Sequence, residues 1–470
     1  MLVIQNLANR EKLKREYLRP RLQHNTQPEL ENGGQSLNRI GLRKEEKAFE
    51  TRVPLVPDHV RLLRDKHGID FVLEPSDQRA FSEEEYGIDV TPLKDSGIPI
   101  VMGIKEMPND IFEKDIVYIF FSHTIKGQTS NMPMLKRIMD VGATLIDYER
   151  VVDETGRRLI FFGNWAGMAG ISDTLRVLGQ RLELMGITPN PFAGMKTTLE
   201  IKELDELKEE FELLENRIKD QGLPSELTPF VVGFAGYGNV SRGAQEIFDI
   251  LPHKTVNPDE LSKLTPESNL LYKCVFKEEH MVEPKDSSLK FNLQDYYKNG
   301  KSKYEGIFHR HIPYITVLMN CIYWSAKYPR LITLDFIRNH WTSDDRRLQV
   351  VGDISCDVRG AIEFTVRCTS PDKPAFTYII DEDRAELGVE GKGPVIMAVD
   401  NLPCELPRES STSFSETLLD FIPALAKADF TVDFSDLELP REFKDAVIVY
   451  RGKLTEKFQY LEQYLPKEEN

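Results

Sequence analysis

Ionisable side chains follow two short apolar runs in the first half of the chain. Lys105 and Glu106 come soon after the run 98–102, and His123 follows the run 116–121. If both runs are strands of one parallel sheet, their carboxyl ends bring an amine and an imidazole to one edge, where the two groups could exchange protons with a substrate amine or carbonyl. A lysine base at neutral pH needs its pKa lowered from about 10.4 towards 7 by burial and neighbouring cations. The alternative is a surface lysine and a hydrogen-bonded core histidine.

A glycine-rich turn lies near the middle of the chain. The apolar run 230–232 leads into Gly236 and Gly238, and an apolar helical pattern follows over residues 244–251. This layout brings backbone amides up to a pyrophosphate and predicts a dinucleotide site. Ser241 stands where a third glycine is usual, and Gly243 comes two residues later. An ordinary tight loop before a helix is the alternative.

The choice of dinucleotide depends on the strand that follows the turn. A carboxylate about 20 residues beyond the glycines would bind the ribose of NAD, but residues 252–258 contain no acid. His253, Lys254 or Arg242 could instead meet a 2′-phosphate. The sequence therefore favours NADPH, with NADH as the alternative cofactor.

Composition excludes several classes of function. The 470 residues carry a net charge of −16 and no Lys/Arg-rich block, which argues against a general nucleic-acid binder. No apolar run approaches the ~18 residues of a membrane helix. The five cysteines are scattered without metal-ligand spacing, so we expect a reducing compartment and no metal site.

Short apolar runs alternate with helical patterns from residue 40 onward, which predicts an α/β fold. We expect strands at 71–73, 98–102, 116–121, 144–146, 159–162, 348–351, 362–366, 376–379 and 395–399, and helices over 166–185 and 204–218. The order predicts two Rossmann-like parallel-sheet domains with a cleft between them. A flexible extension covers 1–38, a substrate domain covers 39–165 plus 408–470, and an inserted dinucleotide-binding domain covers 166–407.

Eight collinear strings over residues 40–461 resemble the lysine-ketoglutarate reductase part of bifunctional aminoadipic semialdehyde synthases. They are also similar to saccharopine dehydrogenases and, more distantly, to alanine dehydrogenases and transhydrogenases. The strings are GIKEMP, FFSHTIKGQ, LIDYE, GRRLIFFGNWAGMAG, GYGNVSRGAQEIF, YPRLIT, GDISCDVRGAIEF and VDNLPCELPRE. The bifunctional enzymes continue into a second dehydrogenase, which we do not expect here.

The resemblance implies roles for particular residues. Lys105 and His123 would be the acid/base pair. The residues implied to bind substrate are Arg52, Glu106, Lys126, Gln128, Glu149, Arg158, Asp353 and Asp357. Those implied to bind cofactor are Gly236, Gly238, Asn239, Val240, Ser241, Asn401 and Leu402. Arg158 in a solvated turn, and Asp353 and Asp357 as capping residues, are the structural alternatives.

The implied reaction condenses L-lysine with 2-oxoglutarate and reduces the imine with NADPH to saccharopine, which a separate glutamate-forming saccharopine dehydrogenase would consume. Reductive amination of another oxo acid by ammonia is one alternative, and a non-catalytic metabolite-binding module is another. We expect a cytoplasmic protein, with the mitochondrial matrix as the alternative, and no nucleic-acid or membrane partner.

Overall fold

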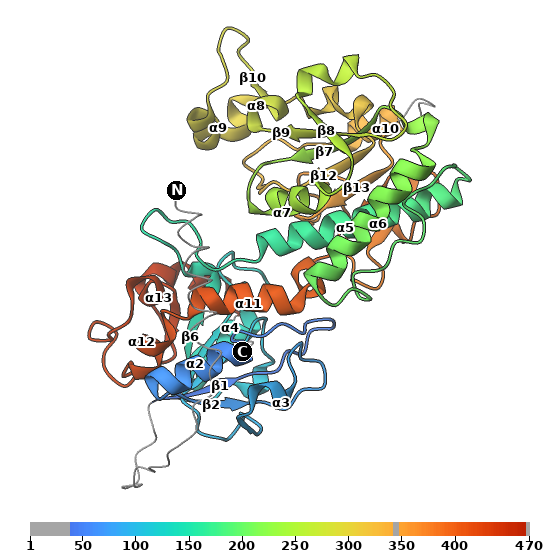
Figure 1. Ribbon diagram of the computed structural model, residues 1–470. Helices are drawn as coiled ribbons and strands as arrows, with labels where there is room; N and C mark the ends of the chain where they lie inside the picture. Colours follow the sequence, from blue (N-terminus) through green and yellow to red (C-terminus); the bar gives the residue numbers. More distant parts are fainter. Residues whose placement is uncertain (1–37, 342–346, 467–470) are drawn as a thin grey trace, which may run out of the picture. The chain divides into compact units, whose positions relative to one another are not determined.

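The structure is a computed structural model that describes residues 38–341 and 347–466. The predicted extension 1–38 lies outside the described residues, apart from Asn38. The described chain is an α/β fold with two eight-stranded sheets (Figure 1). Among these residues, no helix is both long enough and apolar enough to cross a membrane.

The first sheet has the order β18-β17-β6-β5-β4-β1-β2-β3 and is parallel from β6 to β3. Its strands are β1 (Arg39–Leu42), β2 (Asp70–Leu73), β3 (Asp89–Val90), β4 (Ile100–Met102), β5 (Val117–Phe120), β6 (Thr144–Asp147), β17 (Val447–Tyr450) and β18 (Lys453–Leu454). The helices along these parts of the chain are α2 (Pro57–His67), α3 (Glu83–Tyr86), α4 (Met132–Val141), α11 (Pro407–Leu418), α12 (Ile422–Lys427) and α13 (Arg441–Lys444).

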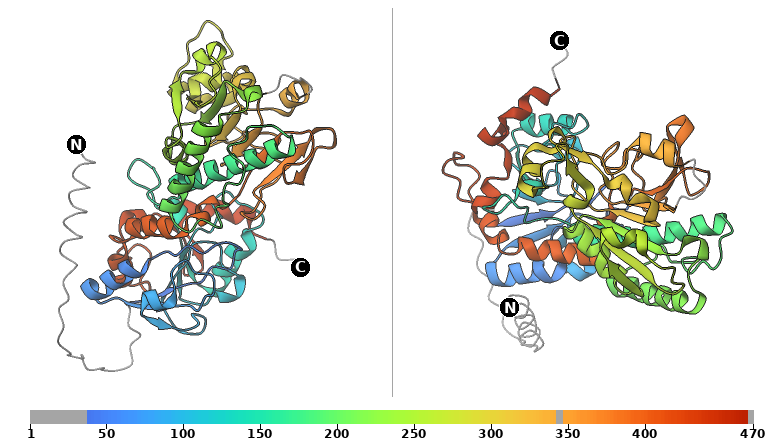
Figure 2. Two further views of the ribbon diagram at one scale, coloured as in Figure 1. Left: turned by 45° about the vertical axis from the view of Figure 1, so that its right-hand side comes forward. Right: turned by 90° about the horizontal axis from the view of Figure 1, so that it is seen from above.

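Helices far apart in the sequence share the core of this sheet. Helices α2 and α11 lie side by side (Figures 1 and 2), and His59 Nδ1 of α2 is 2.7 Å from Ser415 Oγ of α11. Phe414 and Leu418 of α11 are buried in the same apolar cluster as the first strands. The C-terminal segment is therefore part of the fold that holds β1 to β6.

The second sheet has the order β15-β14-β16-β13-β12-β7-β9-β8, in which β14 runs antiparallel to both of its neighbours, β15 and β16. Its strands are β7 (Phe230–Ala235), β8 (His253–Val256), β9 (Leu271–Phe276), β12 (Val317–Asn320), β13 (Val350–Asp353), β14 (Ala375–Ile379), β15 (Arg384–Leu387) and β16 (Val395–Met397). A separate hairpin joins β10 (Val282–Pro284) to β11 (Tyr304–Gly306). The helices are α5 (Gly163–Leu184), α6 (Leu204–Gln221), α7 (Asn239–Phe248), α8 (Glu278–Met281), α9 (Leu293–Asn299) and α10 (Leu334–His340).

Most predicted strands and both predicted helices are present, because continuous apolar runs suit parallel strands that are buried on both faces. Every residue of β7 is buried, for example. Two predicted strands are wrong. Residues 159–162 form a loop before α5, and β17 pairs with β6 instead. Residues 362–366 make only an isolated bridge, between Ile362 and Ile332. The domain boundaries given above stay a prediction.

Candidate active site

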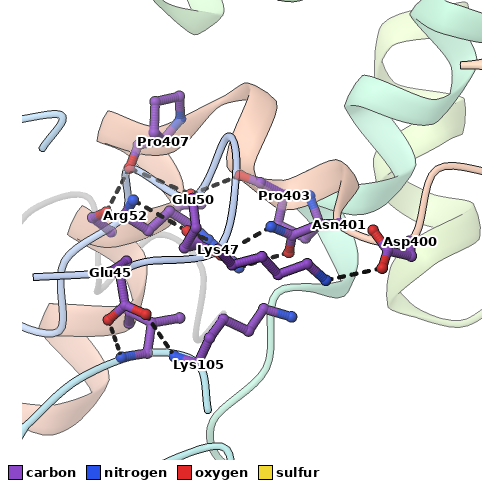
Figure 3. Close-up of polar contacts among 12 residues, drawn as sticks. Glu45, Lys47, Glu50, Arg52, Lys105, Asp400, Asn401, Pro403 and Pro407 are labelled. Atoms are coloured by element: carbon purple, nitrogen blue, oxygen red, sulfur yellow. Dashed lines mark hydrogen bonds and ion pairs between the residues drawn. The ribbon is translucent and has the colours of Figure 1, made fainter. Parts of the chain in front are cut away.

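Lys105 lies just beyond the carboxyl end of β4. A buried carboxylate fixes its backbone, because Glu45 accepts hydrogen bonds from the amides of Ile104 and Lys105 at 2.6 and 2.9 Å. Burial, with Glu50 nearby, raises the pKa of Glu45 to about 7. Figure 3 shows Glu45 below the Lys47 side chain, with its two bonds to the Lys105 strand end.

The Lys105 side chain is part-buried among charged groups of both signs. Burial lowers its pKa, and the charges of Arg52 and Lys47 lower it further, while Glu50 and Glu106 act in the opposite direction. Among the residues drawn in Figure 3, none bonds to this amine. The site therefore disfavours the protonated form of Lys105 and leaves its nitrogen available.

A buried ion pair lies beside Lys105. Arg52 donates from Nε and Nη2 to the two Glu50 oxygens at 2.7 and 2.5 Å, and its Nη2 reaches Asn401 Oδ1 at 3.0 Å. Asn401 Nδ2 in turn donates to Glu50 at 2.9 Å. Burial opposes the charge of Glu50, but Arg52, Asn401 and Lys105 outweigh it and lower its pKa to about 2. Two Arg52 donors are thus already satisfied, so a substrate carboxylate could take them only by displacing Glu50.

A second ion pair connects the loop after β1 to the segment after β16. Lys47 Nζ lies 2.9 Å from Asp400 Oδ2, one residue before Asn401. The loop after β1 is thus tied twice to the segment after β16, by Lys47 to Asp400 and by Arg52 to Asn401 (Figure 3). These contacts join positions about 350 residues apart in the sequence.

His123 lies at the neighbouring strand end. Strands β4 and β5 pair in parallel, and the Phe121 amide donates to Ile104 O at 3.0 Å. His123 Nδ1 lies 2.5 Å from Glu106 Oε1, and its φ is +50°, an uncommon value for a non-glycine residue. Burial opposes the charge of Glu106, but the bond to His123 lowers its pKa. Glu106 therefore connects the strand end of Lys105 to that of His123.

The predicted residues near β6 form a further group. Arg158 donates to the Glu149 carboxylate, which is mostly buried. Burial raises the pKa of the neighbouring Asp147 to about 6. The Gln128 Oε1 atom is buried without a hydrogen bond among the described residues.

The two predicted aspartates of the second sheet differ in their surroundings. Asp353 is buried and accepts from Asn320 Nδ2 at 2.8 Å and from Thr365 Oγ1 at 2.5 Å. Asp357 is exposed, although partial desolvation of its carboxylate raises its pKa and the charge of Lys126 opposes this rise. The bonds of Asp353 are those of a core residue, whereas Asp357 is accessible.

The glycine turn joins β7 to α7. Gly236 has a φ of +94°, a region that favours glycine, and Gly238 precedes the first residue of the helix, Asn239. A Cβ atom at Gly238 would meet no heavy atom within 4 Å, so there is open space in front of its backbone. Ser241 is buried, and the part-buried Val240 packs against the apolar cluster between the second sheet and helices α5, α6 and α7. Leu402 is buried against Gly170 of α5.

A cavity of about 480 Å³ adjoins this turn. Its walls include Gly236, Tyr237 and Gly238, and its other lining residues are Glu278, Met281, Tyr296, Tyr297, Cys321, Ile322, Tyr323 and Tyr328. Open space beside glycine amides at a helix start suits a pyrophosphate with its nucleoside. Within 38–341 and 347–466, no cluster of three His, Cys, Asp or Glu residues is placed to hold a metal ion.

No role was predicted from the sequence for several residues of the site. Glu45, Lys47 and Glu50 lie in the charged run 43–52, which also resembles a solvated surface segment. Asp400 directly precedes Asn401, so the VDNLP string was a signal for it. No local signal pointed to Glu278.

The chain is similar to known proteins in sequence and in fold. The model of the alanine dehydrogenase/PNT N-terminal domain matches residues 41–169, and that of the C-terminal domain matches residues 308–457. An alpha-aminoadipic semialdehyde synthase from Arabidopsis thaliana is 37% identical over 88% of this chain and 40% of its own length. A saccharopine dehydrogenase [NAD(+), L-lysine-forming] from Emericella nidulans is 27% identical over 89% of this chain and 97% of its own length.

Among solved structures, an L-alanine dehydrogenase has a TM-score of 0.56 at 18% identity and covers 91% of this chain and all of its own, which shows the shared fold. The chain spans less than half of the plant synthase. The two family models together match more than half of the chain. The chain therefore belongs to the alanine dehydrogenase/PNT family, alongside the alpha-aminoadipic semialdehyde synthases and saccharopine dehydrogenases.

Proposed function

We propose that this protein is a lysine–2-oxoglutarate reductase, an oxidoreductase that acts on a CH–NH bond and forms saccharopine. The observation that carries the proposal is the part-buried Lys105 amine, which has a lowered pKa and lies at a strand end next to that of His123. A lysine whose pKa is lowered is a better proton acceptor at a given pH than an ordinary surface lysine, and imine formation requires a proton acceptor. The names of the synthase and saccharopine dehydrogenase relatives support this reaction class.

The reaction needs several proton transfers. The ε-amine of lysine adds to the ketone of 2-oxoglutarate, the carbinolamine loses water to give an imine, and the imine carbon then accepts a hydride. Lys105 would take the proton that the attacking amine releases, and protonated His123 would give one to the departing hydroxyl. Glu106, bound to His123 Nδ1, would hold the imidazole in place. Because these side chains follow adjacent parallel strands, they can serve one reacting carbon.

A nicotinamide dinucleotide would supply the hydride. The open space in front of Gly238, the φ of Gly236 and the adjoining cavity fit its pyrophosphate and adenosine. The amides at Gly238 and Asn239 would donate to the pyrophosphate, with Val240 and Ser241 continuing the helix start. Asn401 and Leu402 are proposed near the nicotinamide.

The substrate contacts are part of the same proposal. Arg158 and Glu149 would meet the charged ends of the substrates, and Lys126 and Gln128 would add polar contacts. The unsatisfied Gln128 Oε1 atom is consistent with an absent polar partner. A separate glutamate-forming saccharopine dehydrogenase would use the product. The cytoplasmic location stays a prediction.

The test measures oxidation of NADH and NADPH by the purified protein with a panel of amino donors and oxo acids, and identifies the product by mass. We expect turnover only when L-lysine and 2-oxoglutarate are both present, with saccharopine as the product. Turnover with ammonium and pyruvate instead would identify an alanine dehydrogenase-like activity and overturn the proposal.

A matched pair of variants tests the catalytic lysine. Lys105→Met should lower kcat by roughly 100-fold or more, because general base catalysis contributes on that order. Lys114→Met replaces an exposed lysine after the same strand and should leave the rate unchanged. If Lys105→Met turns over as fast as the parent, a non-catalytic binding module becomes the better interpretation.

A further inference from the structure

The strand beside the glycine turn is not the next strand in the sequence. Strand β9 pairs in parallel with β7 along its whole length, and β8 lies beyond β9 at the edge of the sheet. The Gly236 amide donates to Phe276 O, the last residue of β9, at 2.9 Å. The residues just after Phe276 therefore flank the glycine turn.

One of these residues is a carboxylate that faces the cavity beside the turn. Glu278 lines this cavity of about 480 Å³ together with Gly236 and Gly238. Tyr297 Oη donates to Glu278 Oε1 at 2.6 Å. The Tyr237 hydroxyl also bonds to this carboxylate. A carboxylate has about four acceptor sites, so it can still accept from a ligand.

The position of Glu278 matches what a dinucleotide requires. In a doubly wound sheet, an acidic side chain at the end of the strand adjacent to the glycine turn accepts hydrogen bonds from the adenosine ribose hydroxyls. A 2′-phosphate at the same place would lie against this carboxylate, and the like charges would repel. The acid is missing from residues 252–258 because those residues belong to the edge strand and its flanks.

The cations that could favour a 2′-phosphate are less well placed. His253 and Lys254 lie on β8, which β9 separates from β7. Arg242 donates to Asn239 Oδ1. Lys277 precedes Glu278 but is exposed and is not among the residues that line the cavity.

We propose that Glu278, held by Tyr297, is the specificity-determining residue that binds the adenosine ribose and makes NADH the preferred cofactor over NADPH. This inference rests on the proposed dinucleotide site and reverses the preference for NADPH drawn from the sequence.

The test measures the binding of NADH and of NADPH to the protein in the absence of amino donor and oxo acid. The fluorescence of the reduced nicotinamide reports the binding. The parent should bind NADH at least tenfold more tightly than NADPH, since a hydrogen bond to a charged group is worth roughly that much. Glu278→Gln should reduce this ratio about tenfold, and Tyr297→Phe should reduce it less. Glu279→Gln, at the neighbouring exposed glutamate, should leave the ratio unchanged.

Two results would overturn the inference: tighter binding of NADPH by the parent, or a ratio that Glu278→Gln does not change. Because the measurement needs no turnover, failure of the proposed reaction would appear separately, as binding of either cofactor without saccharopine formation.

Discussion

A lysine that must lose its proton near neutral pH needs neighbours that disfavour its charge. Burial lowers the pKa of Lys105 most, and the charges of Arg52 and Lys47 lower it further. The two cations are themselves balanced, Arg52 by Glu50 and Lys47 by Asp400. The arrangement therefore places positive charge beside the amine without leaving either cation unpaired.

This arrangement predicts a shift in pH dependence when Lys47 is replaced. Lys47→Met removes a neighbouring cation, so the pKa of Lys105 should rise. If unprotonated Lys105 is the base, the acid limb of the profile of kcat/KM against pH should move to higher pH, and the lost activity should return in alkaline buffer. Lys44→Met, in the same segment, should leave the limb in place. An unchanged or acid-shifted limb in Lys47→Met would contradict the role of this cation.

At the scale of elements, the glycine turn depends on how closely α5 and α7 approach. A Cβ atom at Gly167 would lie 2.0 Å from Val240 O and 2.6 Å from the Ala244 amide, and one at Gly243 would lie 2.0 Å from Asn164 O. The two helices therefore touch through their backbones. Gly243 provides the close approach that the sequence pattern expects two residues earlier, at the position of Ser241.

Gly167→Ala should displace the first turn of α7, because Val240 O belongs to helix backbone that cannot move aside locally. We expect weaker cofactor binding, by roughly tenfold or more, and a loss of stability of about 1–3 kcal/mol from overpacking. Cofactor titration and denaturant unfolding would measure the two effects. Gly170→Ala on the same helix meets only side-chain ends of Ile354 and Leu402, so a smaller effect is expected. Equal effects in both variants would argue against the backbone contact.

The strands show what local sequence pattern can and cannot predict. Strands such as β5 and β7 are found because their apolar runs are buried throughout. Residues 159–162 have a similar pattern, but β17 takes the place beside β6, and that pairing joins segments about 300 residues apart. Local pattern reports burial, whereas strand pairing depends on distant residues.

The residues of the site likewise include some that local sequence pattern predicts and some that it does not. Lys105 and His123 are predictable because each follows a strand, and parallel strands end at one edge. Glu50 is not, because it becomes a buried residue through Asn401, about 350 residues later. Glu278 is missed because the strand that carries it is next to β7 in space but not in sequence.

At the scale of the whole molecule, one buried acidic pair bears on stability. Asp173 of α5 and Glu405, in the turn before α11, are both almost fully buried. Arg176 lies 3.8 Å from Asp173, and the Asp173 and Glu405 carboxyls share a side-chain hydrogen bond. Burial raises the pKa of both carboxyls, and Asp173 raises that of Glu405 further. The folded state therefore holds protons here that the unfolded chain releases.

Because the folded pKa values are raised, the free energy of unfolding should fall as pH increases above the unfolded values near 4. Glu405→Gln replaces one of these carboxyl groups with an amide that does not ionise, so unfolding no longer releases a proton at this position. Its melting temperature should exceed that of the parent by at least about 2 °C at pH 8, with a smaller difference or none at pH 5. Glu416→Gln, at an exposed position of α11, should show no such pH-dependent gain. A Glu405→Gln protein that is less stable than the parent at pH 8 would contradict this account. It would mean that the Glu405 carboxylate is ionised in the folded state and that its pairing stabilises the fold by more than its burial destabilises it.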